Sequence, residues 1–135
     1  MQNNDLLANM FVSINRGILK NQFKIHCKKS KYLLNILSIF FKEGLINGYR
    51  ISKDNNNNVE ILLKYIYGQT IIKKIKKIST NGKLVYIKKN KLINKLLYEN
   101  KNLDGIIILS TSKGLMSHKE AILKNLGGFI ICKIT

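Results

Sequence analysis

Positive charge dominates this 135-residue sequence and limits the surroundings in which the chain can stay folded. The 24 lysines and arginines outnumber the 7 aspartates and glutamates, which gives a formal net charge of +17 at pH 7. Charges of one sign repel one another in a compact chain, so a polyanion that neutralises the charged face is the expected partner. The excess therefore favours nucleic-acid binding over two alternatives, a merely soluble basic protein and a protein held on anionic membranes.

The length and the apolar content set the scale of the fold. Hydrophobic residues make up 45% of the 135 residues, which is enough for one core or for two small lobes. No apolar run reaches the roughly 18 residues that a membrane-spanning helix needs, so we predict no membrane partner. The start of the chain lacks the features of a secretory signal or a transit peptide. Cys27 and Cys132 predict free thiols in a reducing compartment.

Periodicity predicts an α-β-α-β-β order for the first lobe. Apolar residues recur at helical spacing over 3–20, and Ser30 is a suitable cap for a second helix that ends at Gly44. Strands are predicted over residues 23–27, 45–52 and 59–67. Gly68 is the predicted boundary between an α/β lobe, residues 1–67, and a second lobe, residues 68–135.

The second lobe is predicted to be mostly β with one short helix, which makes the whole chain α+β. Strands are predicted over residues 70–80, 83–89, 105–109 and 129–134. Asn81-Gly82 indicates a hairpin between the first two, because both residue types accept positive φ. Residues 91–102 are ambiguous between helix and loop. Ser117 and Glu120 fit a capping box, and the helix they begin is predicted to end at Gly127-Gly128.

The run Ser110-Thr111-Ser112-Lys113-Gly114 is the sharpest local motif. It follows a predicted strand and precedes the capped helix. Hydroxyls both donate and accept hydrogen bonds, so this turn can meet base edges, 2′-hydroxyls and phosphates in a shallow RNA minor groove. An ordinary Ser/Thr turn is the alternative interpretation.

A basic segment surrounds the predicted Asn-Gly hairpin and includes Lys73, Lys74, Lys76, Lys77 and Lys83. Such a segment suits contacts with phosphates, which position a nucleic acid without reading its sequence, although a solvated strand face would look the same. Tyr86 lies inside this segment. It is either an aromatic that stacks on a sugar or base or a core residue.

Other chemistries are disfavoured. The sequence contains no Gly-x-Ser-x-Gly nucleophile elbow, and His26 and His118 have no obvious orienting carboxylate, so we expect no hydrolase or other enzyme. These histidines and the two cysteines lack the paired spacings of zinc sites. No glycine-rich nucleotide loop is present. We therefore predict no metal, no cofactor and no small-molecule substrate.

The ordered set of these motifs resembles the family of small-subunit ribosomal protein S8, in its bacterial type, over nearly the whole chain. The set that carries the resemblance is Ser110-Thr111-Ser112, Gly114, Met116, Glu120-Ala121, Gly127-Gly128 and Cys132. The chain departs from the family pattern at Lys28, Asn81, Leu84, His118 and Ile122, which indicates that some RNA contacts are rewired.

The resemblance implies a two-lobed α+β protein that binds the central domain of small-subunit rRNA, supports its assembly and contacts neighbouring ribosomal proteins. It implies that Ser110, Thr111 and Ser112 read a minor groove and that Gly114 permits close approach of the backbone. The remaining implied RNA-site residues are Ser30, Lys31 and Lys113 for the RNA backbone, Tyr86 for stacking or support, and Glu120 for fixing the turn.

The abundance of lysine, asparagine and isoleucine and the absence of proline and tryptophan indicate an AT-rich gene. Together with the start of the chain, this favours a mitochondrial small ribosomal subunit, with a plastid or the cytoplasm of an AT-rich bacterium as alternatives. The rival function is that of a free regulatory RNA- or DNA-binding protein outside any particle.

Overall fold

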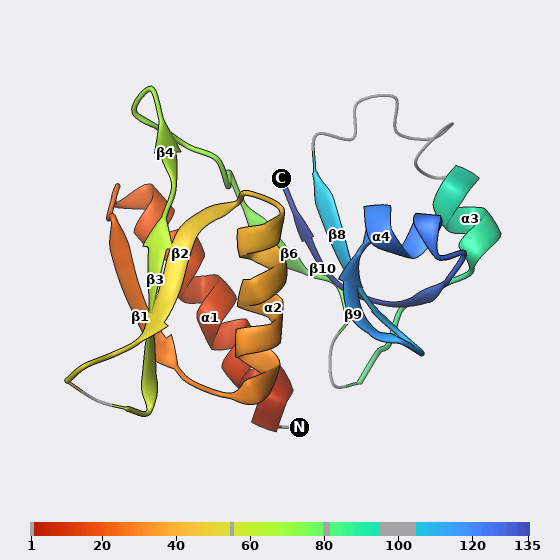
Figure 1. The fold of residues 1–135 in the computed structure, drawn as a ribbon, viewed down its shortest axis with the longest axis horizontal. Helices are drawn as coiled ribbons and strands as arrows, with labels where there is room; N and C mark the ends of the chain where they lie inside the picture. Colours follow the sequence, from red (N-terminus) through yellow and green to blue (C-terminus); the bar gives the residue numbers. More distant parts are fainter. Residues whose placement is uncertain (1, 55, 80–81, 95–104) are drawn as a thin grey trace. The chain divides into compact units, whose positions relative to one another are not determined.

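The computed structural model describes residues 2–54, 56–79, 82–94 and 105–135. The chain forms two compact units, Met1–Ile75 and Lys76–Thr135, which follow one another along the colour bar of Figure 1. Both units combine helices with strands, and the second is mostly β with short helices. The predicted α+β class is therefore confirmed.

The first unit begins with the predicted α-β-α-β-β order. It contains α1 (Gln2–Leu19), β1 (Lys24–Lys28), α2 (Lys31–Lys42), β2 (Ile46–Ile51), β3 (Asn58–Leu63), β4 (Tyr65–Ile66) and β5 (Gln69–Thr70). Strands β1, β3 and β2 form an antiparallel sheet in that order, with β3 in the centre. Helix α1 contacts β1, α2 contacts β2, and the helices contact each other, so they share the core of this unit.

Helical spacing of apolar residues explains both helices. The fully buried side chains of α2 recur three and four residues apart, as one face of a helix requires: Leu33, Ile36, Leu37 and Phe40. The Ser30 hydroxyl accepts a hydrogen bond from the backbone N–H of Leu33 at 3.1 Å and so caps the helix. Gly44, at φ +76°, follows the C-cap and reverses the chain. The predicted start and end of α2 are confirmed.

The carboxylate of Glu60, on the central strand, is held between cations from the two neighbouring strands. Glu60 of β3 is buried, and its Oε2 accepts a hydrogen bond from Nε of Arg50 at 2.6 Å. Nζ of Lys24 lies 3.7 Å from Oε1 of the same residue. The hydrogen bond from Arg50 lowers the pKa of the Glu60 carboxyl, so the charge of Glu60 is favoured in the folded sheet.

A hairpin follows β3 where one continuous strand was predicted. Strand β3 ends at Leu63, and β4 then pairs with β5 through Tyr65↔Thr70 and Ile66↔Gln69. Tyr67 and Gly68 form the two-residue turn, with φ +52° and +77°. Gly68, the predicted boundary, therefore lies at the tip of a hairpin of the first unit.

The second unit is built around its last strand. It contains β7 (Tyr86–Ile87), α3 (Lys89–Asn94), β8 (Ile106–Thr111), β9 (Gly114–Ser117), α4 (His118–Leu123), β10 (Gly128–Ile134) and all of β6 (Ile75–Lys77) except its first residue, which is the last of the first unit. The sheet order is β6-β10-β8-β9, and β7 also pairs with β10. Helices α3 and α4 contact each other, and α4 contacts β8 and β9.

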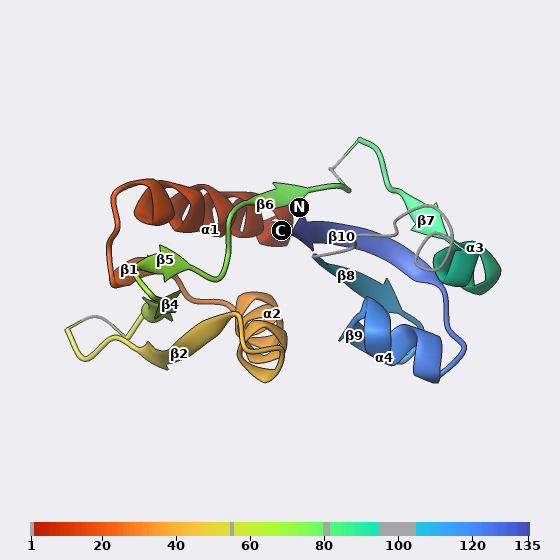
Figure 2. The ribbon, with the colours of Figure 1, turned by 90° about the horizontal axis from the view of Figure 1, so that it is seen from above.

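The predicted hairpin between residues 70–80 and 83–89 is wrong in its pairing. The strands there are short, and β6 and β7 each pair with β10 rather than with each other; Figure 2 shows them one after the other along it. The backbone N–H of Ile78 donates to the carbonyl of Ile131, and the N–H of Ile130 donates to that of Val85. Hydrogen bonds to β10 therefore replace the bonds that a local hairpin would have made. Residues 80–81 lie outside the described residues.

An apolar cluster packs β7, β8, β9 and β10 against α3 and α4. Its buried members are Ile87, Leu92, Ile107, Leu109, Met116, Ala121 and Ile130. Part of the ambiguous segment 91–102 belongs to α3, and residues 95–102 lie outside the described ones. Among the helices that the structure describes, none is long and apolar enough to cross a membrane.

Candidate nucleic-acid interface

The Ser/Thr motif forms the end of a β-hairpin. Strands β8 and β9 pair from Ile108↔Ser117 to Thr111↔Gly114, which leaves Ser112 and Lys113 as the turn. Gly114 adopts φ +108°, a conformation that L side chains rarely adopt, so glycine is required where β9 begins. Strand β9 was not predicted, because its residues coincide with the turn and helix-capping signals.

The three hydroxyls of the motif have different roles. Oγ1 of Thr111 donates to the carbonyl of Gly114 at 2.8 Å and accepts from the backbone N–H of Lys113 at 3.2 Å. Both bonds lie within the turn, so this side chain fixes its shape. Ser112 and Lys113 are exposed at the tip. Among the described residues, the Ser112 hydroxyl has no hydrogen-bond partner, so it is available to an external ligand.

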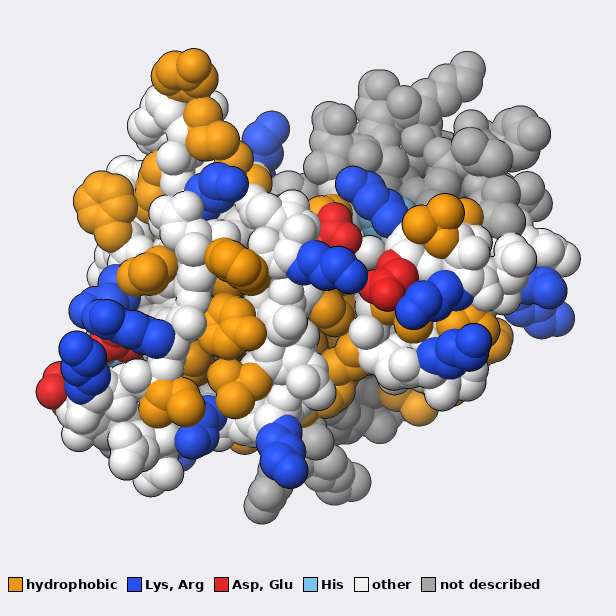
Figure 3. All heavy atoms as spheres, viewed as in Figure 1, with side chains coloured by type: hydrophobic (Ala, Val, Ile, Leu, Met, Phe, Trp, Pro, Cys, Tyr) orange, Lys and Arg blue, Asp and Glu red, His pale blue; other side chains and the backbone are white. Residues whose placement is uncertain are grey.

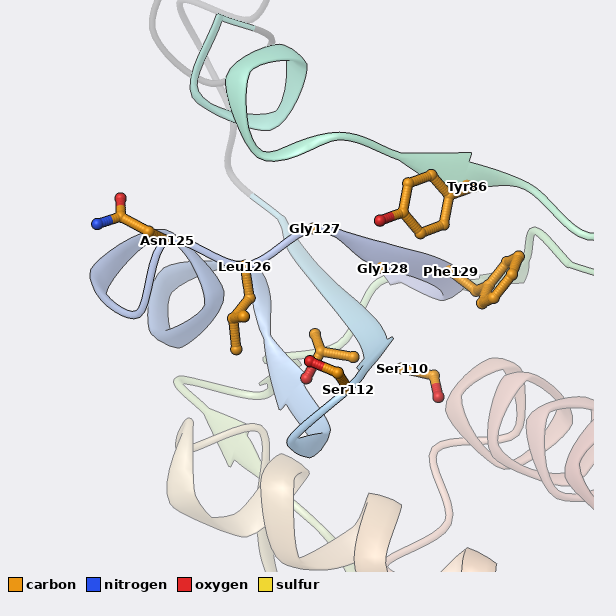
Figure 4. A pocket seen from close by; sticks show the side chains of 9 residues that line it. Tyr86, Ser110, Ser112, Asn125, Leu126, Gly127, Gly128 and Phe129 are labelled. Atoms are coloured by element: carbon orange, nitrogen blue, oxygen red, sulfur yellow. The ribbon is translucent and has the colours of Figure 1, made fainter.

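A pocket of about 460 Å³ lies beside this turn (Figure 4). Its lining residues come from three places in the second unit, namely Tyr86, Ser110–Ser112 and Asn125–Phe129. Tyr86 and Phe129 are cross-strand neighbours, and their ring centroids lie 5.2 Å apart with the ring planes at 74°. Tyr86 is 56% exposed and Phe129 is 39% exposed, so Tyr86 is not a core residue. The pocket therefore joins an aromatic surface to a row of hydroxyls.

Two glycines bring the strands around the pocket close together. A Cβ on Gly127 would lie 2.5 Å from the carbonyl oxygen of Ile87, and one on Gly128 would overlap the carbonyl oxygen of Ser110. Strands β7 and β8 can therefore approach both sides of β10 only where the side chains are missing. This approach brings Tyr86 and Ser110 to the same pocket.

Helix α4 anchors the hairpin from its other end. The Ser117 hydroxyl accepts from the N–H of Glu120 at 3.4 Å, which confirms the predicted N-cap, and the Glu120 carboxylate pairs with Nζ of Lys124 at 3.1 Å. Nδ1 of His118, which is buried, accepts from the N–H of Ile107 at 3.0 Å and ties the helix to β8. The predicted helix end at Gly127-Gly128 is wrong. The helix ends at Leu123, before the C-cap Lys124, and Asn125 at φ +55° reverses the chain.

Known proteins are similar to this chain over nearly its whole length. The family model described as Ribosomal protein S8 matches residues 5–135. This chain belongs to the ribosomal protein S8 family. It is 38% identical to the small ribosomal subunit protein uS8m of Acanthamoeba castellanii, over 96% of this chain and 98% of that protein. It is 34% identical to the small ribosomal subunit protein uS8 of Buchnera aphidicola subsp. Schizaphis graminum and 36% identical to that of Orientia tsutsugamushi, each over 99% of both chains.

The predicted site residues of this S8-family chain fall in both units. Tyr86, Ser110, Thr111 and Ser112 line one pocket, and Lys113, Gly114 and Glu120 belong to the hairpin and helix beside it. Lys76, Lys77 and Lys83 also belong to the second unit, whereas Ser30, Lys31, Lys73 and Lys74 belong to the first. Of these lysines, all except Lys77 are exposed. Figure 3 shows that lysine and arginine side chains are distributed over the visible face of each unit.

Several pocket residues were missed by sequence reasoning. Phe129, Asn125 and Leu126 line the pocket but were not predicted as site residues. In β10, exposed Phe129 lies between buried Gly128 and buried Ile130, which turns its ring away from the apolar cluster that contains Ile130. The sequence around it is a run of apolar residues and does not show which of them faces outward.

The surroundings of the two cysteines bear on whether a thiol could act as a nucleophile or as a metal ligand. Burial raises the pKa of the Cys132 thiol to about 12, and burial also raises the pKa of Cys27. Both thiols therefore stay neutral at physiological pH, when a nucleophile or metal ligand would need a thiolate. No group of three or more histidine, cysteine, aspartate or glutamate residues that could hold a metal ion is present within the described ranges.

Proposed function

We propose that this chain is a structural constituent of the small ribosomal subunit and binds the central domain of its rRNA. The family match over residues 5–135, with the Ser/Thr hairpin intact, is the observation that carries the proposal. A net charge of +17 supplies the attraction to a polyanion. The protein acts by binding alone, without catalysis, since family membership and the neutral thiols both favour a non-enzymatic role.

The second unit supplies the reading surface in this proposal. The exposed Ser112 hydroxyl and the Ser110 hydroxyl contact the RNA minor groove, and Gly114 lets the backbone approach it. Thr111 contributes indirectly, because its hydroxyl holds the turn in shape. Tyr86 stacks on a base or sugar, supported by the edge of Phe129. Glu120 acts through the helix that anchors the hairpin.

Lysines of both units hold the RNA backbone. The proposed phosphate contacts are Lys31, Lys73 and Lys74 of the first unit and Lys76, Lys77, Lys83 and Lys113 of the second, with Ser30 fixing the helix that carries Lys31. Each lysine that neutralises a phosphate of duplex RNA releases counterions, so its removal lowers the slope of log affinity against log salt by roughly one unit. Lys76→Ala and Lys113→Ala are expected to do so with no change in base preference.

Sedimentation tests the proposal directly. Native lysate is run through a high-salt sucrose gradient, and the chain is followed by mass spectrometry. We expect it to migrate with the small subunit after the salt wash. Recovery only at the top of the gradient would contradict a ribosomal role and favour a free regulatory protein.

We also propose that the particle is the mitochondrial small ribosomal subunit. The AT-rich character of the sequence and the 38% identity to a protein named uS8m support a mitochondrion, while the bacterial uS8 relatives make a bacterial cytoplasm the main alternative and a plastid a further one. Purifying mitochondria before the gradient tests this part, because the chain should be enriched with the mitochondrial particle.

A further inference from the structure

Tyr67, at the tip of the β4–β5 hairpin, is an exposed aromatic residue in a backbone conformation that aromatic residues rarely adopt. The residue is fully exposed, and its backbone has φ +52°. Two-residue turns in which both residues have positive φ strongly prefer asparagine, aspartate and glycine. A bulky aromatic in this conformation is disfavoured, and such strain is found at positions that carry a function. The tip therefore exposes the Tyr67 ring to solvent, and the positive φ of this residue lowers the stability of the turn.

The hairpin holds this ring on a defined support. Beyond the two pairs of β4 and β5, the N–H of Ile71 donates to the carbonyl of Lys64 at 3.1 Å. The Tyr65 ring lies edge-on to Phe23 with centroids 5.2 Å apart, and its hydroxyl donates to the carbonyl of Gln22. The position of the tip is thus fixed against the body of the first unit, which lowers the ordering cost of binding a ligand there.

A polar pocket of about 340 Å³ begins at the next residue along the turn. It is lined by Asn21, Gly68, Gln69, Thr70 and Lys73. Asn21 is itself held in a left-handed conformation at φ +53°, where its N–H donates to the carbonyl of Ile18. Two carboxamides and a hydroxyl offer both donors and acceptors, and Lys73 offers a positive charge.

These groups match the parts of one nucleotide. Carboxamides pair with the edges of unpaired bases, an ammonium binds phosphate, and a bare aromatic ring stacks on a base. No aspartate or glutamate occurs in residues 61–98, so nothing in the hairpin segment repels a phosphate. The core of a protein–protein interface is depleted of charged residues, whereas this pocket contains Lys73.

We infer that the β4–β5 tip binds one unpaired nucleotide of RNA. The base stacks on Tyr67, its edge meets the carboxamides of Asn21 and Gln69, and its phosphate contacts Lys73. This inference rests on the proposed function, since the RNA is small-subunit rRNA, and it adds a binding site in the first unit to the hairpin site of the second.

The Tyr67→Asn variant of the full chain gives a sharp test, because asparagine suits the turn better than tyrosine and removes only the ring. Affinity for the transcribed small-subunit rRNA is measured by filter binding at one fixed salt concentration. Loss of one stacked base is expected to weaken binding by about fivefold to a hundredfold. Tyr67→Phe keeps the ring and should bind within about twofold of the wild type. Ile66→Thr, the matched control on the same hairpin, should leave the affinity unchanged.

The outcomes separate this inference from the proposed function. If Tyr67→Asn binds as tightly as the wild type while Ser112→Ala binds more weakly, the nucleotide site is wrong and the rRNA-binding function stands. If the wild type does not bind the rRNA, both are overturned. If Tyr67→Asn binds rRNA normally but is missing from salt-washed particles, the tip docks onto a protein and the inference is again overturned.

Discussion

Substitutions at Thr111 and Ser112 should separate the stability of the hairpin from its contact with RNA. The Thr111 hydroxyl makes two hydrogen bonds inside the turn, to the carbonyl of Gly114 and from the N–H of Lys113. Valine has nearly the same shape as threonine and makes neither bond. The Ser112 hydroxyl is exposed, and alanine at that position removes no hydrogen bond between the described residues.

The expected magnitudes follow from these contacts. A net hydrogen bond contributes about 0.5–1.5 kcal/mol, and both Thr111 bonds are exposed to water, so Thr111→Val should lower the free energy of unfolding by about 1–2 kcal/mol. Ser112→Ala should change that free energy by less than about 0.5 kcal/mol. The Ser112→Ala variant should bind the rRNA about 1–3 kcal/mol more weakly if the hydroxyl contacts a base edge.

Two assays on the same proteins give the comparison. Urea unfolding followed by circular dichroism should show a lower midpoint for Thr111→Val and an unchanged midpoint for Ser112→Ala. Filter binding to the rRNA at one salt concentration should show the larger loss for Ser112→Ala. If Ser112→Ala destabilised the fold and left affinity intact, the assignment of Ser112 as the contact and of Thr111 as the support would be refuted.

Three other changes test the supports of the fold. Gly128→Ala should destabilise the second unit by more than about 2 kcal/mol in urea unfolding, because a Cβ at this position overlaps a carbonyl of β8. Gly48→Ala is the control, because a Cβ there meets no atom within 4 Å. Equal losses of stability in the two variants would contradict this packing. Ser117→Ala should cost about 1 kcal/mol through loss of the α4 cap, and an unchanged midpoint would show that the cap contributes nothing. Because the pKa of Glu60 is lower in the folded protein than its ordinary value of 4.5, the charged carboxylate stabilises the fold at pH values above 4.5. This stabilisation is lost as the pH falls through the lowered pKa of the folded state. The gap in thermal midpoint between wild type and Glu60→Gln should therefore narrow below pH 4.5, and a gap of equal size at pH 7 and pH 3 would refute the role of Arg50.

Elements fixed by local chemistry were predictable from the sequence. Helix α2 has an apolar face, a serine that caps its first turn and a glycine that reverses the chain, and all three signals lie within 15 residues, 30–44. The N-cap Ser117 was predictable for the same reason, because its partner Glu120 is three residues away. Such features depend on neighbours along the chain and need no knowledge of the tertiary fold.

Pairing over long distances was not predictable in this way. Asn81-Gly82 has a strong hairpin propensity, yet β6 and β7 on either side of it both bond to β10, about fifty residues further along. Gly127-Gly128 predicts a helix stop from the sequence alone, whereas in the structure both glycines allow the close approach of strands. A glycine can serve either purpose, and only the neighbouring backbone decides which.

The candidate site shows the same division. The hydroxyls of Ser110–Ser112 and the ring of Tyr86 were identifiable as residue types suited to RNA, and the resemblance to the S8 family pointed to them. Their meeting with Phe129 in one pocket depends on the register of β7, β8 and β10, which no local pattern encodes.

The central position of β10 affects when the second unit can fold during synthesis of the chain. Strands β6, β7 and β8 all bond to β10, although β10 is the last of them to be synthesised. A nascent chain that has already released residues 76–127 still lacks the strand to which three others bond, so the complete sheet of the second unit can form only after β10 has been synthesised. Premature termination would leave Tyr86 and Ser110 without their common pocket. Unfinished chains would then be poor competitors for the binding place of the complete protein.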